Sequence, residues 1–340
     1  MKSLNAINNK ISKELFENLK SKYILQKIFN NLLKKKLLDI IKYNKNKQKG
    51  INININDYKN YSEKYSSIEI EIIPAINKYG DFININKEDE KFFHIYFNND
   101  KEEEISRKYL DKNEQIQIIK IIIDYPVESF KDLFNSCYCI ESVCFKKFNR
   151  NNINNMFGMF SGCSSLKKLN LSNFNTSNVK DMGCMFSNCK LLKELNLSSF
   201  NTNNVIDMGS MFSKCKLLKE LNLSNFNTNN VKDMSYMFDG CSSIKKLNLS
   251  NFNNNNVTNM EFMFSGCSSL IYLNLDKFNT INVTNMRNMF FECSSLRDLN
   301  LSDFNTNNVI NMRFMFYGCS EHFQKKIKAQ NMNIKEEAFN

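Results

Sequence analysis

Cysteine is the residue type in this chain whose regular spacing most clearly suggests a chemical role. A thiol can form a disulfide, ligate a metal or act as a nucleophile. An odd total of 11 cysteines does not suit a disulfide framework, and a free cysteine is a small side chain that is readily buried. We therefore predict a buried structural ladder from the seven that recur at one constant interval: Cys163, Cys189, Cys215, Cys241, Cys267, Cys293 and Cys319.

Other catalytic and metal-binding patterns are missing from the sequence. The chain has two histidines, His94 and His322, and no Ser-His-Asp set, phosphate-binding glycine loop or zinc-ligand spacing. Cys137, Cys139 and Cys144 lie close together, but no second Cys/His pair follows them at a zinc spacing. We therefore expect a protein that is not an enzyme, with no catalytic, metal-binding or cofactor-binding residues and no cofactor.

The elements that would position these side chains follow from a repeat with the consensus L-x-x-L-N-L-S-x-F-N-T-x-N-V-x-D-M-x-x-M-F-x-x-C. In one copy Leu195 and Leu197 alternate with Asn196, which is the period of a short strand. The next apolar residues have the three- and four-residue spacings typical of one helical face: Met208, Met211, Phe212 and Cys215. Asp or Asn before the first Met would cap a helix, and Gly or Asn before most of the cysteines would end it. Each unit is therefore predicted to be strand, turn, short helix and turn.

A single repeat unit buries too little apolar surface to fold alone, so the units must stack. Stacking places like residue on like residue, with a parallel sheet on one face and the helices on the opposite face. The sequence therefore predicts an α/β solenoid, a right-handed leucine-rich-repeat-like array over residues 113–320. Degenerate copies of the motif precede Cys163, as expected of a capping repeat.

The segment NVKDMSYMFDGCSSIKKLNLSNFN resembles the BspA-like leucine-rich repeats, the 26-residue repeat of bacterial surface proteins. The resemblance extends over about residues 116–320 and implies a leucine-rich-repeat solenoid with a binding role, often adhesion, in bacteria and some protists. The sequence shows no signal peptide, no anchor and no apolar run of about 18 residues. We therefore expect a cytoplasmic protein without a transmembrane segment, and the cell surface is the alternative that the resemblance implies.

Two sets of variable positions could recognise a partner. The sheet-face set has mixed charges, which predict no strong electrostatic steering: Lys168, Glu194, Glu220, Lys246, Tyr272 and Asp298. The helix-side set holds aromatic residues where several other copies have Ser, Gly, Asp or Asn: Phe262, Phe291, Phe314 and Tyr317. Clustered exposed aromatic residues suggest a partner surface, although neighbouring helices could also cover them.

A third row consists of the asparagines at the centre of the L-N-L triplets. Their amides could form a polar recognition stripe, or they could hydrogen-bond to one another along the stack, which is the arrangement we expect. The row contains Asn170, Asn196, Asn222, Asn248, Asn274 and Asn300.

Most of the net charge of +11 belongs to residues 1–50, which hold 13 lysines against three acidic residues. The rest of the chain is nearly neutral, so we expect no nucleic-acid binding by the solenoid. Apolar stripes predict a basic helical segment at 1–48, which could contact a membrane surface or nucleic acid, or dock on a partner helix through residues 10–48. The stretch 22–48 is similar to an F-box, the module that links a substrate receptor to a ubiquitin ligase, but it lacks the usual Leu-Pro and Trp.

The remaining segments flank the array. Residues 49–112 are predicted to be a small mixed α/β connector or N-terminal cap, with strands at 68–73, 82–85 and 92–97 and a charged helix at 102–110. Residues 321–340 are predicted to be a C-terminal capping helix and tail, because Phe323, Ile327 and Ile334 would cover the last coil.

These features favour a noncatalytic scaffold that binds a protein partner of unknown identity through the solenoid. An F-box-like substrate adaptor of a ubiquitin ligase is one alternative, which depends on the helical segment at 22–48. A cell-surface adhesin of the BspA-like type is the other, which follows from the resemblance alone.

Overall fold

The structure is a computed structural model, and it describes residues 66–98, 104–124, 127–276, 278–301, 304–330 and 334–340. The chain divides into two compact units, Met1–Ser66 and Ser67–Asn340. The predicted helical segment at 1–48, with its F-box-like stretch and the docking residues 10–48, lies outside the described residues.

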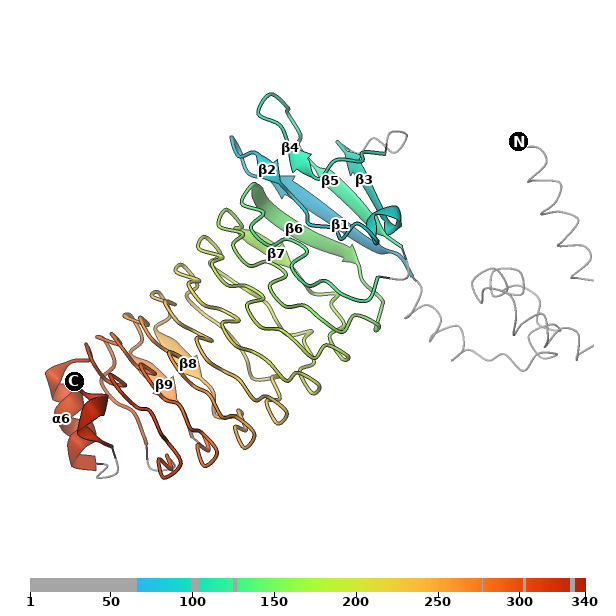
Figure 1. The fold of residues 1–340 in the computed structure, drawn as a ribbon. Helices are drawn as coiled ribbons and strands as arrows, with labels where there is room; N and C mark the ends of the chain where they lie inside the picture. The colour runs from blue at the N-terminus through green and yellow to red at the C-terminus, as the bar shows by residue number, and fades with distance from the viewer. Residues whose placement is uncertain (1–65, 99–103, 125–126, 277, 302–303, 331–333) are drawn as a thin grey trace, which may run out of the picture. The chain divides into compact units, whose positions relative to one another are not determined.

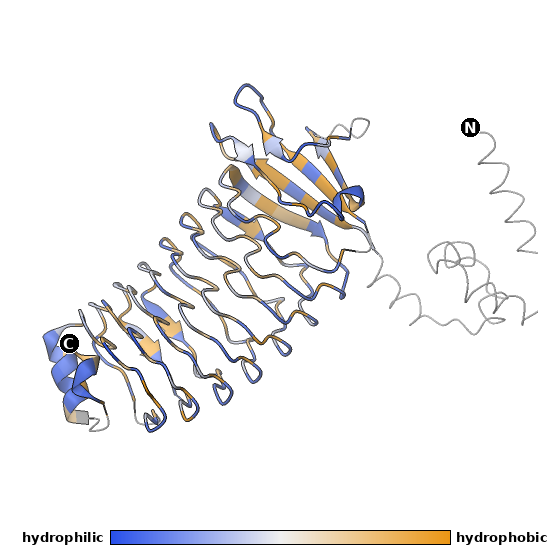
Figure 2. Ribbon diagram, viewed as in Figure 1, coloured by the Kyte–Doolittle hydropathy of each residue, from blue (hydrophilic) through white to orange (hydrophobic). Residues whose placement is uncertain are grey.

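The second unit begins with a five-stranded sheet in the order β3-β5-β1-β6-β7 (Figure 1). Its strands are β1 (Ile68–Pro74), β3 (Phe93–Phe97), β5 (Ile119–Ile123), β6 (Ile140–Lys147) and β7 (Lys168–Asn170). Only the β6–β7 pair is parallel; the other three pairs in this sheet are antiparallel. In β1 the buried Ile68, Ile70 and Ile72 alternate with Glu69 and Glu71, which places one face on the core. Figure 2 shows this alternation of apolar and polar residues along the strands.

Two of the elements predicted before the array differ from the structure. The charged helix predicted at 102–110 is wrong for the described residues, because 104–108 are irregular and β4 (Tyr109–Leu110) follows. The strand predicted at 82–85 is also wrong, since these residues are irregular although Phe82 and Ile83 are buried. β4 pairs antiparallel with β2 (Gly80–Asp81), and a short 3-10 helix, η1, spans Glu90–Phe92.

From β6 onward the chain makes one coil per sequence repeat. The β6–β7 register pairs Val143 with Leu169, and β8 (Lys246–Asn248) pairs in the same parallel way with β9 (Tyr272–Asn274). Further parallel bridges join Asp181 to Asp207 and continue at the same interval from 129 to 311. The predicted stacking of equivalent residues is therefore present, and Figure 1 shows the coils side by side.

The continuous sheet predicted on the L-N-L face is present only in part. β7 continues the N-terminal sheet, β8 pairs with β9, and Tyr272 forms a bridge to Asp298. Residues 194–196 and 220–222 are not strands, and here Lys219 N donates to the Lys193 carbonyl at 3.4 Å. The other face of each coil carries the more regular hydrogen bonds.

The short helix predicted in each unit is wrong, because residues 208–215 and their equivalents are consecutive turns. Alternate N–H groups donate to the next coil, as Ser210 N does to the Ser235 carbonyl at 2.7 Å. The N–H groups between them close turns within the coil, as Met211 N does to the Met208 carbonyl at 3.2 Å. Ser210 has a φ of +56°, which suits the third residue of a type II turn. The backbone is thus satisfied without a helix.

Like side chains stack along the core of the array. The rings of Phe186 and Phe212 are 5.7 Å apart and nearly parallel, and the pair Phe238 and Phe264 is 5.5 Å apart. At the C-terminal end α6 (Glu321–Gln330) and the 3-10 helix η2 (Glu336–Ala338) follow the last coil. Phe323 and Ile327 of α6 are buried, so this segment covers the end of the core.

Candidate functional site

The seven cysteines of the ladder are buried and free of disulfides. Each thiol donates to a phenylalanine carbonyl of the preceding coil, as Cys215 Sγ does to Phe186 O at 3.1 Å. Burial raises the pKa of Cys215 to about 12 and likewise that of Cys319 to about 12, so these thiols stay protonated at neutral pH. A protonated thiol is neither a good nucleophile nor a metal ligand, and the ladder is structural.

The sheet-face set lies in one exposed row. Lys246 pairs with Tyr272, and Tyr272 forms a bridge to Asp298, so the side chains follow one another at the interval of one coil. All six members are exposed: Lys168, Glu194, Glu220, Lys246, Tyr272 and Asp298. The charges are of both signs along the row, and Asp298 also bonds Lys326 Nζ at 2.8 Å. This row offers a mixed polar surface.

Five of the six asparagines at the centre of the L-N-L triplets, from Asn170 to Asn274, bond within their own coil and not in the expected amide ladder. The side-chain oxygen of Asn196 accepts a hydrogen bond from Ser198 N at 3.0 Å, and Asn222 accepts one from Ser224 N at 3.0 Å. The same turn occurs at Asn170, Asn248 and Asn274. These asparagines therefore shape the bend that follows each triplet.

Three of the four predicted aromatic residues come together near the C-terminal end of the array. Phe291 stacks on Tyr317 with the ring centres 5.4 Å apart, and Phe314 meets the same tyrosine edge-on at 5.9 Å. Phe262 instead stacks on Tyr236 at 4.7 Å. The sequence prediction missed Tyr236, although it lies one repeat before Phe262 and the interval alone could have identified it.

Charged residues missed by the sequence prediction extend this surface. The guanidinium of Arg287 lies 5.9 Å from the ring centre of Phe262, and that of Arg313 lies 6.0 Å from Phe314. These distances allow cation–π attraction. Arg287 is also 3.7 Å from a carboxylate oxygen of Glu261. We call the following residues the aromatic–arginine patch: Tyr236, Glu261, Phe262, Arg287, Phe291, Arg313, Phe314 and Tyr317.

The backbone beneath the patch is strained. Tyr236, Phe262 and Phe314 have φ values of +57°, +55° and +58°, and the smaller residues at the equivalent positions also have a positive φ: Asp132, Gly158, Cys184, Ser210 and Asn288. A bulky residue in this region costs on the order of 1–3 kcal/mol. All three are only partly buried, so packing in the core does not account for them. Because the positive φ belongs to the turn of every coil, the clustered and partly exposed rings and the two arginines are what make the patch the candidate site.

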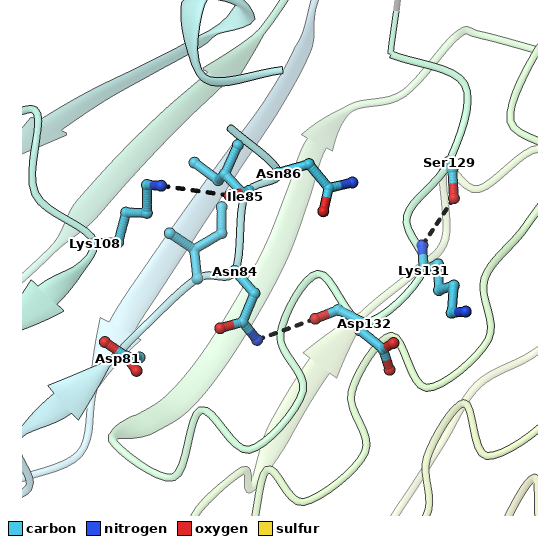
Figure 3. A pocket seen from close by; sticks show the side chains of 9 residues that line it. Asp81, Asn84, Ile85, Asn86, Lys108, Ser129, Lys131 and Asp132 are labelled. Carbon is cyan, nitrogen blue, oxygen red and sulfur yellow. Dashed lines mark hydrogen bonds between the residues drawn. The ribbon is translucent and has the colours of Figure 1, made fainter. Parts of the chain in front are cut away.

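A polar cavity of about 530 Å³ lies beside the first coil (Figure 3). Asn84 reaches across to the Asp132 carbonyl at 3.1 Å, and Lys108 donates to the Ile85 carbonyl at 3.4 Å and pairs with Glu90. Its two lysines and two aspartates balance in charge: Asp81, Lys108, Lys131 and Asp132. Because Asn84 joins the N-terminal segment to the first coil through the Asp132 and Asn135 carbonyls, we assign the cavity a structural role.

Comparison with protein families gives three matches along the chain. A model described as "Mycoplasma protein of unknown function, DUF285" matches residues 127–248, 191–273 and 243–339, which together span more than half of the chain. The chain belongs to the DUF285 family. No curated protein and no solved structure matches this DUF285 chain.

The DUF285 matches coincide with the coiled part of the structure. They begin at residue 127, near the first turns that bond to the next coil, and end at 339 in the C-terminal cap. Within the described ranges of this DUF285 protein, no group of three or more His, Cys, Asp or Glu side chains is placed to hold a metal ion. No helix among those residues is both long enough and apolar enough to cross a bilayer.

Proposed function

We propose that this DUF285 protein is a noncatalytic scaffold that binds a protein partner through its array of coils. The observation that carries the proposal is the aromatic–arginine patch. It combines partly exposed aromatic rings and two arginines on neighbouring coils. Aromatic residues and arginine are enriched at protein interfaces, where they contribute much of the binding energy.

The finer parts of the proposal concern the architecture and the compartment. We propose a right-handed leucine-rich-repeat-like solenoid of the BspA-like type, which the constant repeat interval and the parallel L-N-L pairs support. We also propose a cytoplasmic location. It is supported by the free cysteines, most of which are buried thiols, since a reducing compartment keeps thiols free.

The test is partner capture from native lysate with the full-length chain as bait. Replacing Phe262 and Phe314 by Ser removes two rings of the patch, and Ser210 shows that Ser fits the same backbone position. Proteins that the wild type captures are expected to be absent from the capture with this double variant. The matched control is Ile310→Ser, which changes a residue that is 79% exposed on the same coil as Phe314.

Thermal unfolding of both variants would show whether the fold is retained. If the double variant folds and captures the same proteins as the wild type and the Ile310→Ser control, the patch is not the binding surface. If quantitative capture finds no protein enriched by the wild type, the scaffold proposal is wrong.

A further inference from the structure

Two consecutive coils depart from the others in the same way just after the buried cysteine. At this point they carry Lys190-Leu191 and Lys216-Leu217. Four other coils have two serines there, at 164–165, 242–243, 268–269 and 294–295. Leu191 is 37% exposed and Leu217 is 36% exposed, so neither leucine completes the core.

Further lysines surround these leucines. Lys193 and Lys219 follow two residues after the exposed leucines, and Lys214 precedes Cys215 with a φ of +58°, where the next coil has Gly240. None of the five lysines is ion-paired to a carboxylate in the described part of the chain. We call these seven residues the lysine–leucine corner: Lys190, Leu191, Lys193, Lys214, Lys216, Leu217 and Lys219.

Stacking brings the corner together. Lys219 N donates to the Lys193 carbonyl at 3.4 Å, so the two coils are hydrogen-bonded neighbours at this point. Adjacent backbones in such a ladder are about 4.8 Å apart, so the backbones of equivalent lysines lie closer than the Debye length of about 8 Å at physiological salt. The exposed Glu194 and Glu220 follow Lys193 and Lys219, so the five lysines leave a surplus of three positive charges on these two coils. A partner that supplies carboxylates would offset this surplus.

We propose that the lysine–leucine corner binds an acidic amphipathic segment of a partner protein. The five lysines select carboxylates, and the exposed Leu191 and Leu217 between them offer contact to apolar side chains of the same segment. The spacing of about 4.8 Å between coils approaches the roughly 5–6 Å between neighbours on one face of a helix. The basic residues 1–50 of this chain are excluded as the occupant by their own 13 lysines. The inference depends on the proposed scaffold function and names a partner class for a second surface.

The experiment uses the full-length chain and a synthetic helical peptide of Glu, Leu and Ala, with Glu on both sides of each Leu. The wild type is expected to bind this peptide and not an analogue with Lys in place of Glu, and the affinity is expected to fall as salt is raised. Replacing Lys190, Leu191, Lys216 and Leu217 by Ser copies the sequence of the four other coils. This variant is expected to retain the fold and to bind the peptide about tenfold or more weakly.

A charge-matched control removes two lysines elsewhere. Lys180→Ser combined with Lys232→Ser changes the net charge by the same amount at exposed positions outside the corner, and binding is expected to remain. Conversely, Ser242→Lys combined with Ser243→Leu would extend the corner by one coil and is expected to strengthen binding.

The proposal is overturned if the wild type does not bind the acidic peptide, or if the corner variant and the control lose binding equally. It is also overturned if the corner binds vesicles of phosphatidylcholine and phosphatidylserine but not the peptide, since the ligand would then be an anionic lipid surface. If the peptide test fails but Phe262→Ser combined with Phe314→Ser still abolishes partner capture, only the proposal for the lysine–leucine corner is wrong and the scaffold function is retained.

Discussion

The buried threonine of the F-N-T sequence shows how single residues join the coils. Thr202 Oγ1 donates to the Asn227 carbonyl at 2.8 Å and accepts from the N–H of the same residue at 2.7 Å. Thr280 makes the same pair of bonds to Asn305. Asn254 occupies this slot in one coil and is only 1% exposed, yet neither of its amide atoms has a hydrogen-bond partner among the described residues. This coil therefore lacks a link that its neighbours have.

Asn254→Thr is expected to stabilise the protein by about 1–3 kcal/mol, because it removes two unsatisfied buried polar atoms and restores the link to the next coil. The free energy of unfolding from urea titration measures the effect. The reverse change two coils earlier, Thr202→Asn, is the matched control and is expected to destabilise by a similar amount. Equal stability of Asn254→Thr and the wild type would contradict the conclusion that the buried, unpaired Asn254 amide destabilises the protein.

Asp207 carries a second residue-scale effect, because it stands between Asp181 and Asp233 in the row of parallel bridges. Burial raises the pKa of the Asp207 carboxyl, the two flanking carboxylates raise it further, and the hydrogen bond from Gly209 N at 2.8 Å opposes the shift. A raised pKa in the folded state means that the stabilising contribution of this group is present at low pH. It is lost as the pH rises through the folded-state value.

Asp207→Asn is therefore expected to stabilise the protein at pH 7 and to have little effect near pH 3.5, below the ordinary aspartate pKa of about 3.9. Asn can keep the turn, as Asn259 does by accepting from Glu261 N at 3.1 Å. Unfolding free energies at the two pH values provide the measurement. Asp298→Asn is a control of opposite sign, since the hydrogen bond from Lys326 lowers the pKa of Asp298. A pH-independent effect of Asp207→Asn would refute the electrostatic explanation.

At the scale of the element, the sequence predicted the repeat but not its local conformation. The constant interval placed the Leu, Phe and Cys rows correctly, because stacking depends only on that interval. The spacing Met208, Met211, Phe212 and Cys215 suits a helix, yet two consecutive turns point the same side chains inward. The turns differ from a helix because two positions in each coil have a left-handed backbone, and one of these positions is often not glycine.

The candidate surfaces could also be predicted only in part from the sequence. Phe291, Phe314 and Tyr317 meet because they share slots or neighbouring slots in successive coils. Arg287 and Arg313 were missed, because a helix would place its side chains at different angles from those in the turns. The lysine–leucine corner was not predicted for a related reason, because on that side of the coil the alternating pattern marks only the L-N-L positions and not the turn after the cysteine.

The positions with a left-handed backbone also lead to a prediction about the turns of each coil. Glu292 has a φ of +56° where Gly266 and Gly318 stand in the adjacent coils, and the left-handed conformation costs a residue with a side chain roughly 1–2 kcal/mol. Glu292→Gly is expected to raise the unfolding free energy by about 1 kcal/mol after the greater freedom of glycine in the unfolded chain is deducted. Differential scanning calorimetry would detect the higher Tm.

Gly318→Ala is the matched change in the opposite direction. Its φ is +74°, and an added Cβ would lie 3.0 Å from Glu292 Cγ, so this variant is expected to be less stable. A stabilising Gly318→Ala, or a destabilising Glu292→Gly, would show that backbone strain does not govern this slot.

At the scale of the whole second unit, the repeated bonding pattern creates an open edge that the C-terminus covers. Each coil presents a row of N–H groups to the next, and at the last coil Phe314 N donates to the Glu337 carbonyl at 2.8 Å and Phe316 N to the Ala338 carbonyl at 2.7 Å. Phe339 is buried and lies 5.5 Å from Phe316, so the tail continues both the ladder and the ring stack. Residues 334–340 thus replace a further coil.

Deleting residues 334–340 is expected to leave those N–H groups and the Phe316 ring without their partners. An uncovered ladder edge is a template for pairing with another chain. The truncated protein should therefore self-associate in a concentration-dependent manner, as measured by analytical ultracentrifugation. A synthetic peptide of residues 334–340 added in excess should reverse the association, because it can reoccupy the edge. If the truncated protein sediments like the full-length chain at every concentration, α6 alone is sufficient to protect the end of the array.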